Sequence, residues 1–189
     1  MRAVDRPTLL LAALLSAGMA LSACSAGDRP ATTSAGAPAK TTSAQAQALP
    51  APTGPPCSPD QYKVDGEPGK KPTITVPAGC APQDGLLVKD LTVGTGAEVK
   101  QGSSVEVQYV LATFRDRKTR EASWDDKPYT VRNVGQASVV QGWNEGLIGL
   151  KEGGRRLLVV PPDKGYPEGN GAIQPGETLV FVIDALKVG

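Results

Sequence analysis

The sequence of 189 residues contains no histidine, three cysteines and few aromatic side chains (2 Trp, 4 Tyr and 2 Phe). Without an imidazole, the chain has no Ser-His-Asp or Cys-His nucleophile and no zinc site with histidine ligands. An excess of charge of one sign is also lacking, because 20 Lys and Arg side chains balance 19 Asp and Glu. Nucleic-acid binders take much of their affinity from a basic surface, so we expect no nucleic-acid partner.

The N-terminus has the layout of a secretory signal. Two arginines precede an uncharged run from Thr8 to Leu21 that is rich in leucine and alanine. The run ends in Leu21-Ser22-Ala23-Cys24, which resembles the lipobox of bacterial lipoproteins, whose cysteine is lipidated and becomes the first residue. We therefore expect residues 1–23 to be a signal peptide and Cys24 to carry a lipid anchor that holds the protein extracytoplasmically on the cell membrane. An ordinary cleavage site or an uncleaved anchor helix is the alternative.

Residues 24–56 have the composition of a tether. Of the 32 residues from 25 to 56, 26 are Ala, Ser, Thr, Gly or Pro. Such a segment buries too little apolar surface to offset the entropy lost on ordering. We expect a flexible linker that begins at the lipidated cysteine.

Cys57 and Cys80 fall in residues 57–83, which we expect to form an extension before the main domain. Between them, Lys71 to Pro77 alternates like a single edge strand. An even number of cysteines outside the cytoplasm favours a disulfide, worth roughly 3 kcal/mol in the loop-entropy model. A redox or thiol-catalytic pair is the alternative, but the sequence lacks the CxxC spacing of such pairs.

From Leu86 onward the pattern becomes regular. Every second residue from Val105 to Leu111 is apolar or aromatic, which is typical of a half-buried antiparallel strand with Tyr109 facing the core. Leu179, Phe181 and Ile183 share a face in the last strand, and the same core is its expected target. Further strands are expected at 86–91, 129–132, 155–160 and 178–188.

One helix interrupts the strands. Trp143, Leu147 and Leu150 recur at i, i+4 and i+7, which indicates a short helix over residues 143–150 that packs across the sheet. The pattern predicts an α+β domain in residues 84–189, with an antiparallel sheet of about five strands and one helix.

Three motifs follow one another in the order of a known family. Val139–Leu147 contains Val-Val-Gln-Gly-Trp, Gly153–Arg156 is Gly-Gly-Arg-Arg, and Pro161–Tyr166 is Pro-Pro-Asp-Lys-Gly-Tyr. With Val107-Gln108-Tyr109 before them and Thr178–Phe181 after them, they resemble FKBP-type peptidyl-prolyl cis-trans isomerases over the whole domain. The resemblance implies a twisted antiparallel half-barrel wrapped around one short helix, with an apolar pocket between them.

Isomerisation in such a pocket needs no cofactor and no metal, because removing water from the imide favours the twisted, less polar transition state. By resemblance, the Trp143 ring would lie under the substrate proline, while the Val140 amide and the Tyr166 hydroxyl would hold substrate carbonyls. The implied catalytic residues are Tyr109, Glu121, Val139, Val140, Trp143, Tyr166 and Phe181, and the implied substrate contacts are Arg120, Tyr129 and Ile173.

Two positions depart from the family pattern. Where the family usually has Phe-Asp-Ser-Ser-Trp, this chain has Arg120-Glu121-Ala122-Ser123-Trp124. Glu121 places its carboxylate one methylene further out, and Arg120 puts a long cation where the family has an aromatic wall. The guanidinium of Arg120 would either favour an acidic residue near the proline or point into solvent.

The sequence therefore predicts a prolyl isomerase that acts on proline-containing segments of exported proteins at the outer face of the membrane. The alternative is a non-catalytic peptide-binding or chaperone lipoprotein on the same fold, because Arg120 and Glu121 replace the Phe-Asp pair. A solute-binding lipoprotein is disfavoured, since the folded part lacks alternating strands and helices. We expect a monomer, and the sequence leaves open whether immunosuppressive macrolides bind.

Overall fold

The computed structural model describes residues 50–189. The predicted signal peptide, Cys24 and the larger part of the predicted linker lie outside the described residues. None of the helices in residues 50–189 has the length and apolar character needed to cross a membrane.

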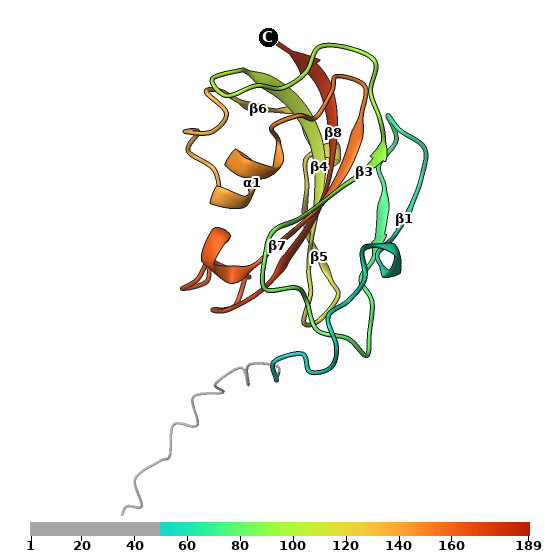
Figure 1. Ribbon diagram of the computed structural model, residues 1–189, viewed down its shortest axis with the longest axis vertical. Coiled ribbons are helices and arrows are strands. Elements are labelled where there is room, and N and C mark those ends of the chain that lie inside the picture. The colour runs from blue at the N-terminus through green and yellow to red at the C-terminus, as the bar shows by residue number, and fades with distance from the viewer. Residues whose placement is uncertain (1–49) are drawn as a thin grey trace, which may run out of the picture. The chain divides into compact units, whose positions relative to one another are not determined.

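A six-stranded antiparallel sheet forms the centre of the domain (Figure 1). Its strand order is β3-β7-β8-β4-β5, and β6 pairs with the first residues of β4. The α+β class and the antiparallel sheet with one short helix are confirmed. The strands are β3 (Leu87–Thr92), β4 (Val105–Thr113), β5 (Thr119–Ala122), β6 (Tyr129–Val131), β7 (Arg155–Val160) and β8 (Leu179–Val188).

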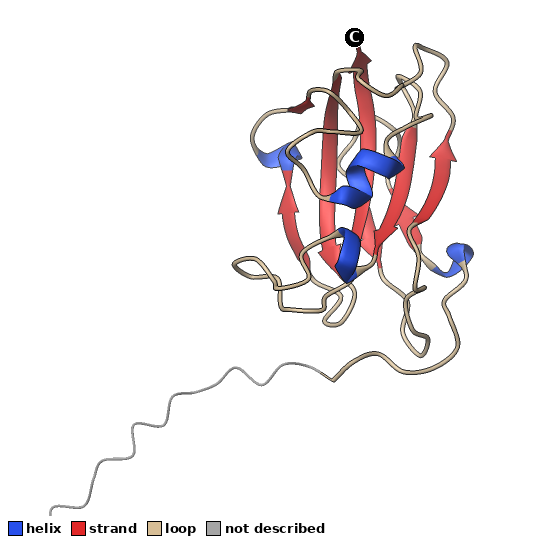
Figure 2. Cartoon of the chain, turned by 60° about the vertical axis from the view of Figure 1, so that its left-hand side comes forward, coloured by secondary structure: helices blue, strands red, loops and turns tan. Residues whose placement is uncertain are grey.

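The single α-helix of the described chain, α1 (Gln141–Gly146), crosses one face of this sheet (Figure 2). The helix is shorter than predicted, because the chain turns after Leu147 and Gly149 has a φ of +82°. The expected apolar stripe is still correct, since Trp143, Leu147 and Leu150 are all buried in the core beneath.

β5 was not among the predicted strands. Its sequence, Thr-Arg-Glu-Ala, has no apolar alternation, and most of its side chains are exposed because it lies at the edge of the sheet. A pattern search for half-buried strands therefore passes over it.

The N-terminal extension folds onto the sheet as well. The predicted edge strand is β2 (Thr73–Thr75), and it pairs with β1 (Lys63–Asp65) in a small two-stranded sheet. Three short 3-10 turns complete the secondary structure: η1 (Pro59–Gln61), η2 (Ser123–Asp125) and η3 (Pro162–Lys164).

The central sheet is covered on both faces, as Figure 1 shows with α1 and β1 on opposite sides. On the helix side the core contains Leu111, Phe181 and Ile183 together with Trp143 of α1 and Leu147 just after it. On the other side Val110 and Val182 pack against the extension. The strands that position the residues of the helix-side core are therefore also packed on their opposite face, against the extension. The extension's contributions to the second core are Cys57, Tyr62, Ile74, Val76 and Cys80.

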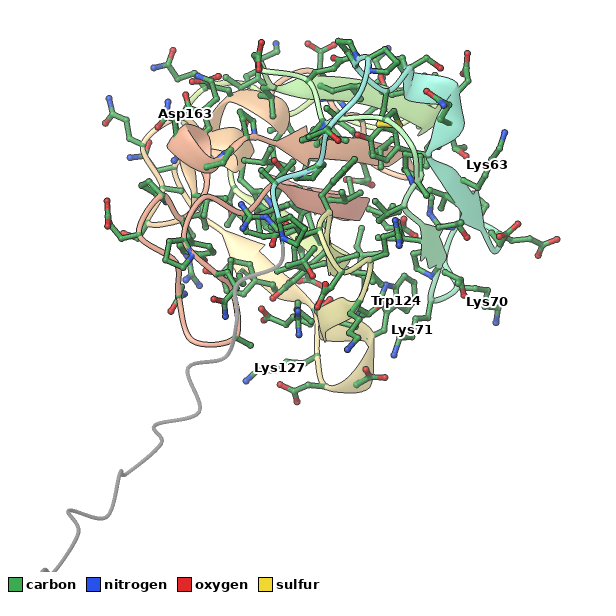
Figure 3. The ribbon with its side chains drawn as sticks, turned by 90° about the horizontal axis from the view of Figure 1, so that it is seen from below. Lys63, Lys70, Lys71, Trp124, Lys127 and Asp163 are labelled. Atoms are coloured by element: carbon green, nitrogen blue, oxygen red, sulfur yellow. A yellow bond between two sulfur atoms is a disulfide. The ribbon has the colours of Figure 1, made fainter. Side chains whose placement is uncertain are left out.

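A disulfide closes a loop within the extension, and an ion pair joins the extension to the domain. Cys57 and Cys80 form the expected disulfide, with their Cα atoms 5.1 Å apart. Just before it, within the segment predicted as linker, the carbonyl of Pro55 accepts a hydrogen bond from the Ala81 amide (2.9 Å). The ion pair of Lys71 with Asp125 (2.6 Å) connects the extension to η2, and Figure 3 labels Lys71 and Trp124 of η2 in this part of the molecule.

Arg155 of β7 is the buried anchor of the same extension. Only 2% of this residue is exposed, and its guanidinium is paired with Asp184 of β8. The remaining N–H groups donate to the carbonyls of Gly66 and Lys70, both at 2.7 Å. A buried guanidinium is tolerated only when its donors are satisfied, so the turn at residues 66–70 is part of the domain.

Candidate active site

A pocket of about 220 Å³ opens between α1 and the sheet. Strands β4, β5, β6 and β8 contribute to it, together with α1, the loop before the helix and the segment after η3. Every residue that the resemblance implied lies in its lining except Arg120 and Ile173. The lining residues are Tyr109, Leu111, Glu121, Tyr129, Ser138, Val139, Val140, Trp143, Tyr166 and Phe181.

Trp143 is surrounded by three other aromatic rings. The centroid of its ring lies 5.2 Å from Tyr109, 5.4 Å from Phe181 and 6.2 Å from Tyr129, with interplanar angles between 76° and 87°. Such edge-to-face pairs are worth about 0.5–1.5 kcal/mol each beyond the area they bury. The four rings therefore support one another, with Trp143 as the floor of the pocket and the other three rings as its walls.

Tyr109 also makes the polar contact of the pocket. Its hydroxyl donates a short hydrogen bond to the carboxylate of Glu121. Burial, and next the hydrogen bond to Glu121, raise the pKa of Tyr109 well above its usual value. The phenol consequently stays protonated, and remains a donor, throughout the physiological pH range.

Arg120 is turned away from the pocket by a bulge. Leu111 pairs with Glu121 and Ala112 pairs with Thr119, so Arg120 is the extra residue between them. Its guanidinium forms an ion pair with Asp116, and its Nε donates to the Thr113 hydroxyl (3.1 Å). The guanidinium is bound to the β4–β5 turn, and the residue remains exposed at the surface, outside the pocket lining.

Ile173 lies in the core on the helix side, with 8% of its surface exposed. Paired backbone hydrogen bonds of 2.9 Å with Asn170 fix its loop. The predicted substrate contact is therefore a core residue in this structure, outside the pocket lining.

The loop that carries Val139 and Val140 is held by Asn144, a residue that the sequence did not single out. The Asn144 Oδ1 accepts hydrogen bonds from the amides of Gly135 (3.0 Å) and Ala137 (2.9 Å). Its Nδ2 donates to the Ala137 carbonyl (3.0 Å). Only 6% of Asn144 is exposed, and these three hydrogen bonds hold its side chain against the loop. In the sequence, the only feature that could have indicated this role of Asn144 is its position directly after Trp143.

The result is a pocket of aromatic and aliphatic side chains with a backbone donor in its lining. Within residues 50–189 the backbone N–H of Val140 has no hydrogen-bond partner, although Val140 lines the pocket. An amide donor of this kind can bind a carbonyl of a ligand that lies over the Trp143 ring. Leu111 and Ser138 complete the lining and were not predicted as site residues.

Comparisons with known proteins agree with this geometry. Residues 96–186 match the family model of FKBP-type peptidyl-prolyl cis-trans isomerases. A probable FK506-binding protein of Corynebacterium glutamicum is 43% identical over 125 residues, which cover 62% of this chain and 98% of the relative. The chain belongs to the FKBP-type isomerase family. An FK506-binding protein of Streptomyces anulatus is 38% identical over 122 residues, covering 63% of this chain and 98% of that protein.

Solved structures of the FKBP fold support the same assignment. AtFKBP13 matches with a TM-score of 0.50 and 28% identity, over 55% of this chain and 93% of that chain. FkpA from Escherichia coli matches with a TM-score of 0.50 and 34% identity, over 55% of this chain and 48% of that chain. The family match begins at residue 96, so the disulfide-bonded extension precedes the matched FKBP region.

Proposed function

We propose that this chain catalyses the cis-trans isomerisation of peptidyl-prolyl bonds in the pocket over Trp143. The observation that carries the proposal is the aromatic cage around Trp143, with an unpartnered backbone N–H at its rim. Membership of the FKBP family supports an isomerase-type function.

The reaction is a rotation about one bond, so it needs no nucleophile from the protein. Resonance gives the peptide bond a rotational barrier of about 18–20 kcal/mol, and the bond before proline isomerises unaided in tens to hundreds of seconds. The twisted transition state has lost this resonance and is less polar than the ground state. Each 1.36 kcal/mol by which the pocket favours it gives a tenfold gain in rate.

In this proposal the residues of the pocket have different roles. The substrate proline lies on the Trp143 ring between Tyr109 and Phe181, where water is excluded. The Val140 amide and the Tyr166 hydroxyl hold the flanking carbonyls, so that the bond turns while the chain on both sides stays bound. Contacts that hold the substrate more strongly when the bond is twisted than when it is planar raise the rate.

The test measures kcat/KM for a Leu-Pro peptide with the full-length protein. We expect Trp143→Ala to lower kcat/KM by at least about tenfold while the circular dichroism spectrum stays native. Trp124→Ala is the matched control, because Trp124 packs against the opposite core and should change kcat/KM by less than about threefold. A folded Trp143→Ala protein with unchanged activity would refute the assignment of the pocket.

Macrolides are a second class of ligand that we propose for the pocket. Several relatives are named FK506-binding proteins, and the aromatic and aliphatic side chains around Trp143 offer a surface on which part of a macrolide can pack. FK506 should inhibit isomerisation competitively with the peptide. Full activity at a saturating concentration of FK506 would exclude binding in this pocket.

We further propose that the protein acts on exported polypeptides from a lipid anchor on Cys24. The signal-like N-terminus supports this location, and so does the Cys57–Cys80 disulfide, since disulfides persist in oxidising compartments. The wild-type protein should fractionate with membranes, and Cys24→Ser should appear in the soluble extracytoplasmic fraction. A Cys24→Ser protein that stays with the membranes would contradict lipid anchoring.

A further inference from the structure

The pocket lining contains a single charged side chain, Glu121. It is exposed, and one of its carboxylate oxygens accepts the hydrogen bond from Tyr109. None of the ion pairs formed within residues 50–189 includes Glu121. The pocket thus presents an uncompensated negative charge to a bound peptide.

The neighbouring cation does not cancel this charge. Arg120 follows the bulge away from the pocket, and its guanidinium is neutralised by Asp116 and bound to Thr113. The β4–β5 turn carries three cations, Arg115, Arg117 and Lys118, and none of them contributes to the pocket lining. Arg115 forms an ion pair with Glu177 and donates to the Gly176 carbonyl, while Arg117 and Lys118 are exposed. Glu121 is therefore the one formally charged residue in the pocket lining.

We propose that Glu121 selects substrates in which a lysine or arginine stands next to the proline, and disfavours those with an acidic residue there. The inference rests on the proposed isomerase function and adds a substrate class to it. It reverses the sign of the preference considered for Arg120 from the sequence, because that side chain is tied to the turn.

The expected size follows from Coulomb's law. We take a separation of about 6 Å between the charge of the substrate residue and the carboxylate of Glu121. At that distance in water-like surroundings, two unit charges change an equilibrium constant about threefold. Exchanging lysine for glutamate replaces an attraction by a repulsion, so kcat/KM should differ about tenfold at low salt. Because Glu121 is exposed, added salt should reduce this ratio.

The experiment uses the full-length protein and peptides that differ only in the residue before or after the proline, which is lysine, leucine or glutamate. Wild type should favour lysine over glutamate about tenfold at one of the two positions, with leucine between them. Glu121→Gln removes the charge but keeps an oxygen that can accept from Tyr109, and it should reduce the ratio to about one. Asp65→Asn removes one carboxylate from the exposed surface of β1, outside the pocket lining, and should leave the ratio unchanged.

The outcomes separate the two proposals. Activity on the Leu-Pro peptide with equal rates for lysine and glutamate overturns the charge preference and leaves the isomerase function standing. A preference for glutamate that Arg120→Gln abolishes reverses the proposal in favour of Arg120. If no peptide is isomerised, the isomerase function fails, and the ratio of dissociation constants of the same peptides, measured by NMR titration, decides the charge preference.

Discussion

Helix α1 touches the sheet with its backbone at Gly142, and this contact gives a sharp prediction. A Cβ atom built on Gly142 would lie 2.5 Å from Cγ1, 2.7 Å from Cγ2 and 3.1 Å from Cβ of Val160. Val160 is fully buried, and a β-branched side chain has few rotamers to escape into. The variant Gly142→Ala therefore forces the helix and β7 apart.

Two effects of opposite sign decide the magnitude. Replacing glycine by alanine inside a helix gains about 1 kcal/mol from helix propensity. Overpacking a well-packed core costs about 1–3 kcal/mol. Ordinary van der Waals contact begins at 3.4 Å, so the backbones must separate by about 1 Å. Overpacking should win, which leaves a net loss of about 1 kcal/mol in the free energy of unfolding.

The effect on catalysis should be larger than the effect on stability. Trp143 follows Gly142 directly, and Val140 precedes it by two residues, so both move with the helix. A misplacement of about 1 Å in a site can cost on the order of 100-fold in rate. We expect kcat/KM for the Leu-Pro peptide to fall by at least about tenfold.

Urea unfolding and the isomerase assay measure the two effects on the same samples. The matched control is Gly85→Ala, because nothing lies within 4 Å of a Cβ at that position. It should leave both quantities nearly unchanged. If Gly142→Ala instead stabilised the protein by about 1 kcal/mol with full activity, the close contact between α1 and β7 would be refuted.

Three further perturbations test other parts of the structure. The double variant Cys57→Ser, Cys80→Ser removes a disulfide with a sequence separation of 23. The loop-entropy model predicts that the free energy of unfolding, measured with urea, falls by about 3 kcal/mol. A decrease below about 1 kcal/mol contradicts this prediction. Asn144→Ala removes the acceptor of two half-buried amides, so KM for the peptide should rise severalfold, with partial rescue by Asn144→Asp, which keeps the acceptor; an unchanged KM argues against positioning of the loop. Burial raises the pKa of Asp116, but the hydrogen bonds it accepts and the charge of Arg120 outweigh this and hold it below 3.8. Its stabilisation is complete above about pH 4 and is lost as pH falls through the lowered pKa, so Asp116→Asn should flatten the acid limb of stability against pH, and an unaltered limb speaks against it.

The central strands and the helix could be predicted because their apolar residues repeat with the periods that burial imposes. Tyr109 faces the helix-side core, and Phe181 joins it from β8, as alternation required. The covering of the second face was harder to foresee. Val110 and Val182 are buried under the extension. The sequence pattern of residues 57–83 does not indicate against which face of the sheet that segment packs.

At the site, prediction failed where a single residue changes the register. The bulge at Arg120 turns its side chain toward Asp116, while Glu121 alone reaches the pocket. An extra residue in one strand shifts the alternation, so every later side chain of that strand lies on the opposite face from the one expected. The spacing of residues in the sequence does not show where such a bulge occurs. Asn144 escaped notice for a related reason, since its three hydrogen bonds join it to a loop whose path depends on the whole fold.

The central claim is that the pocket turns the prolyl bond and does not merely bind it. Two-dimensional NMR exchange spectroscopy on a Leu-Pro peptide, with a catalytic amount of the full-length protein, separates these possibilities in one spectrum. We predict exchange cross-peaks between the cis and trans signals that vanish when Trp143→Ala replaces the wild type. Peptide signals that broaden on binding while cis and trans remain unexchanged would contradict catalysis and identify a peptide-binding module on an isomerase fold.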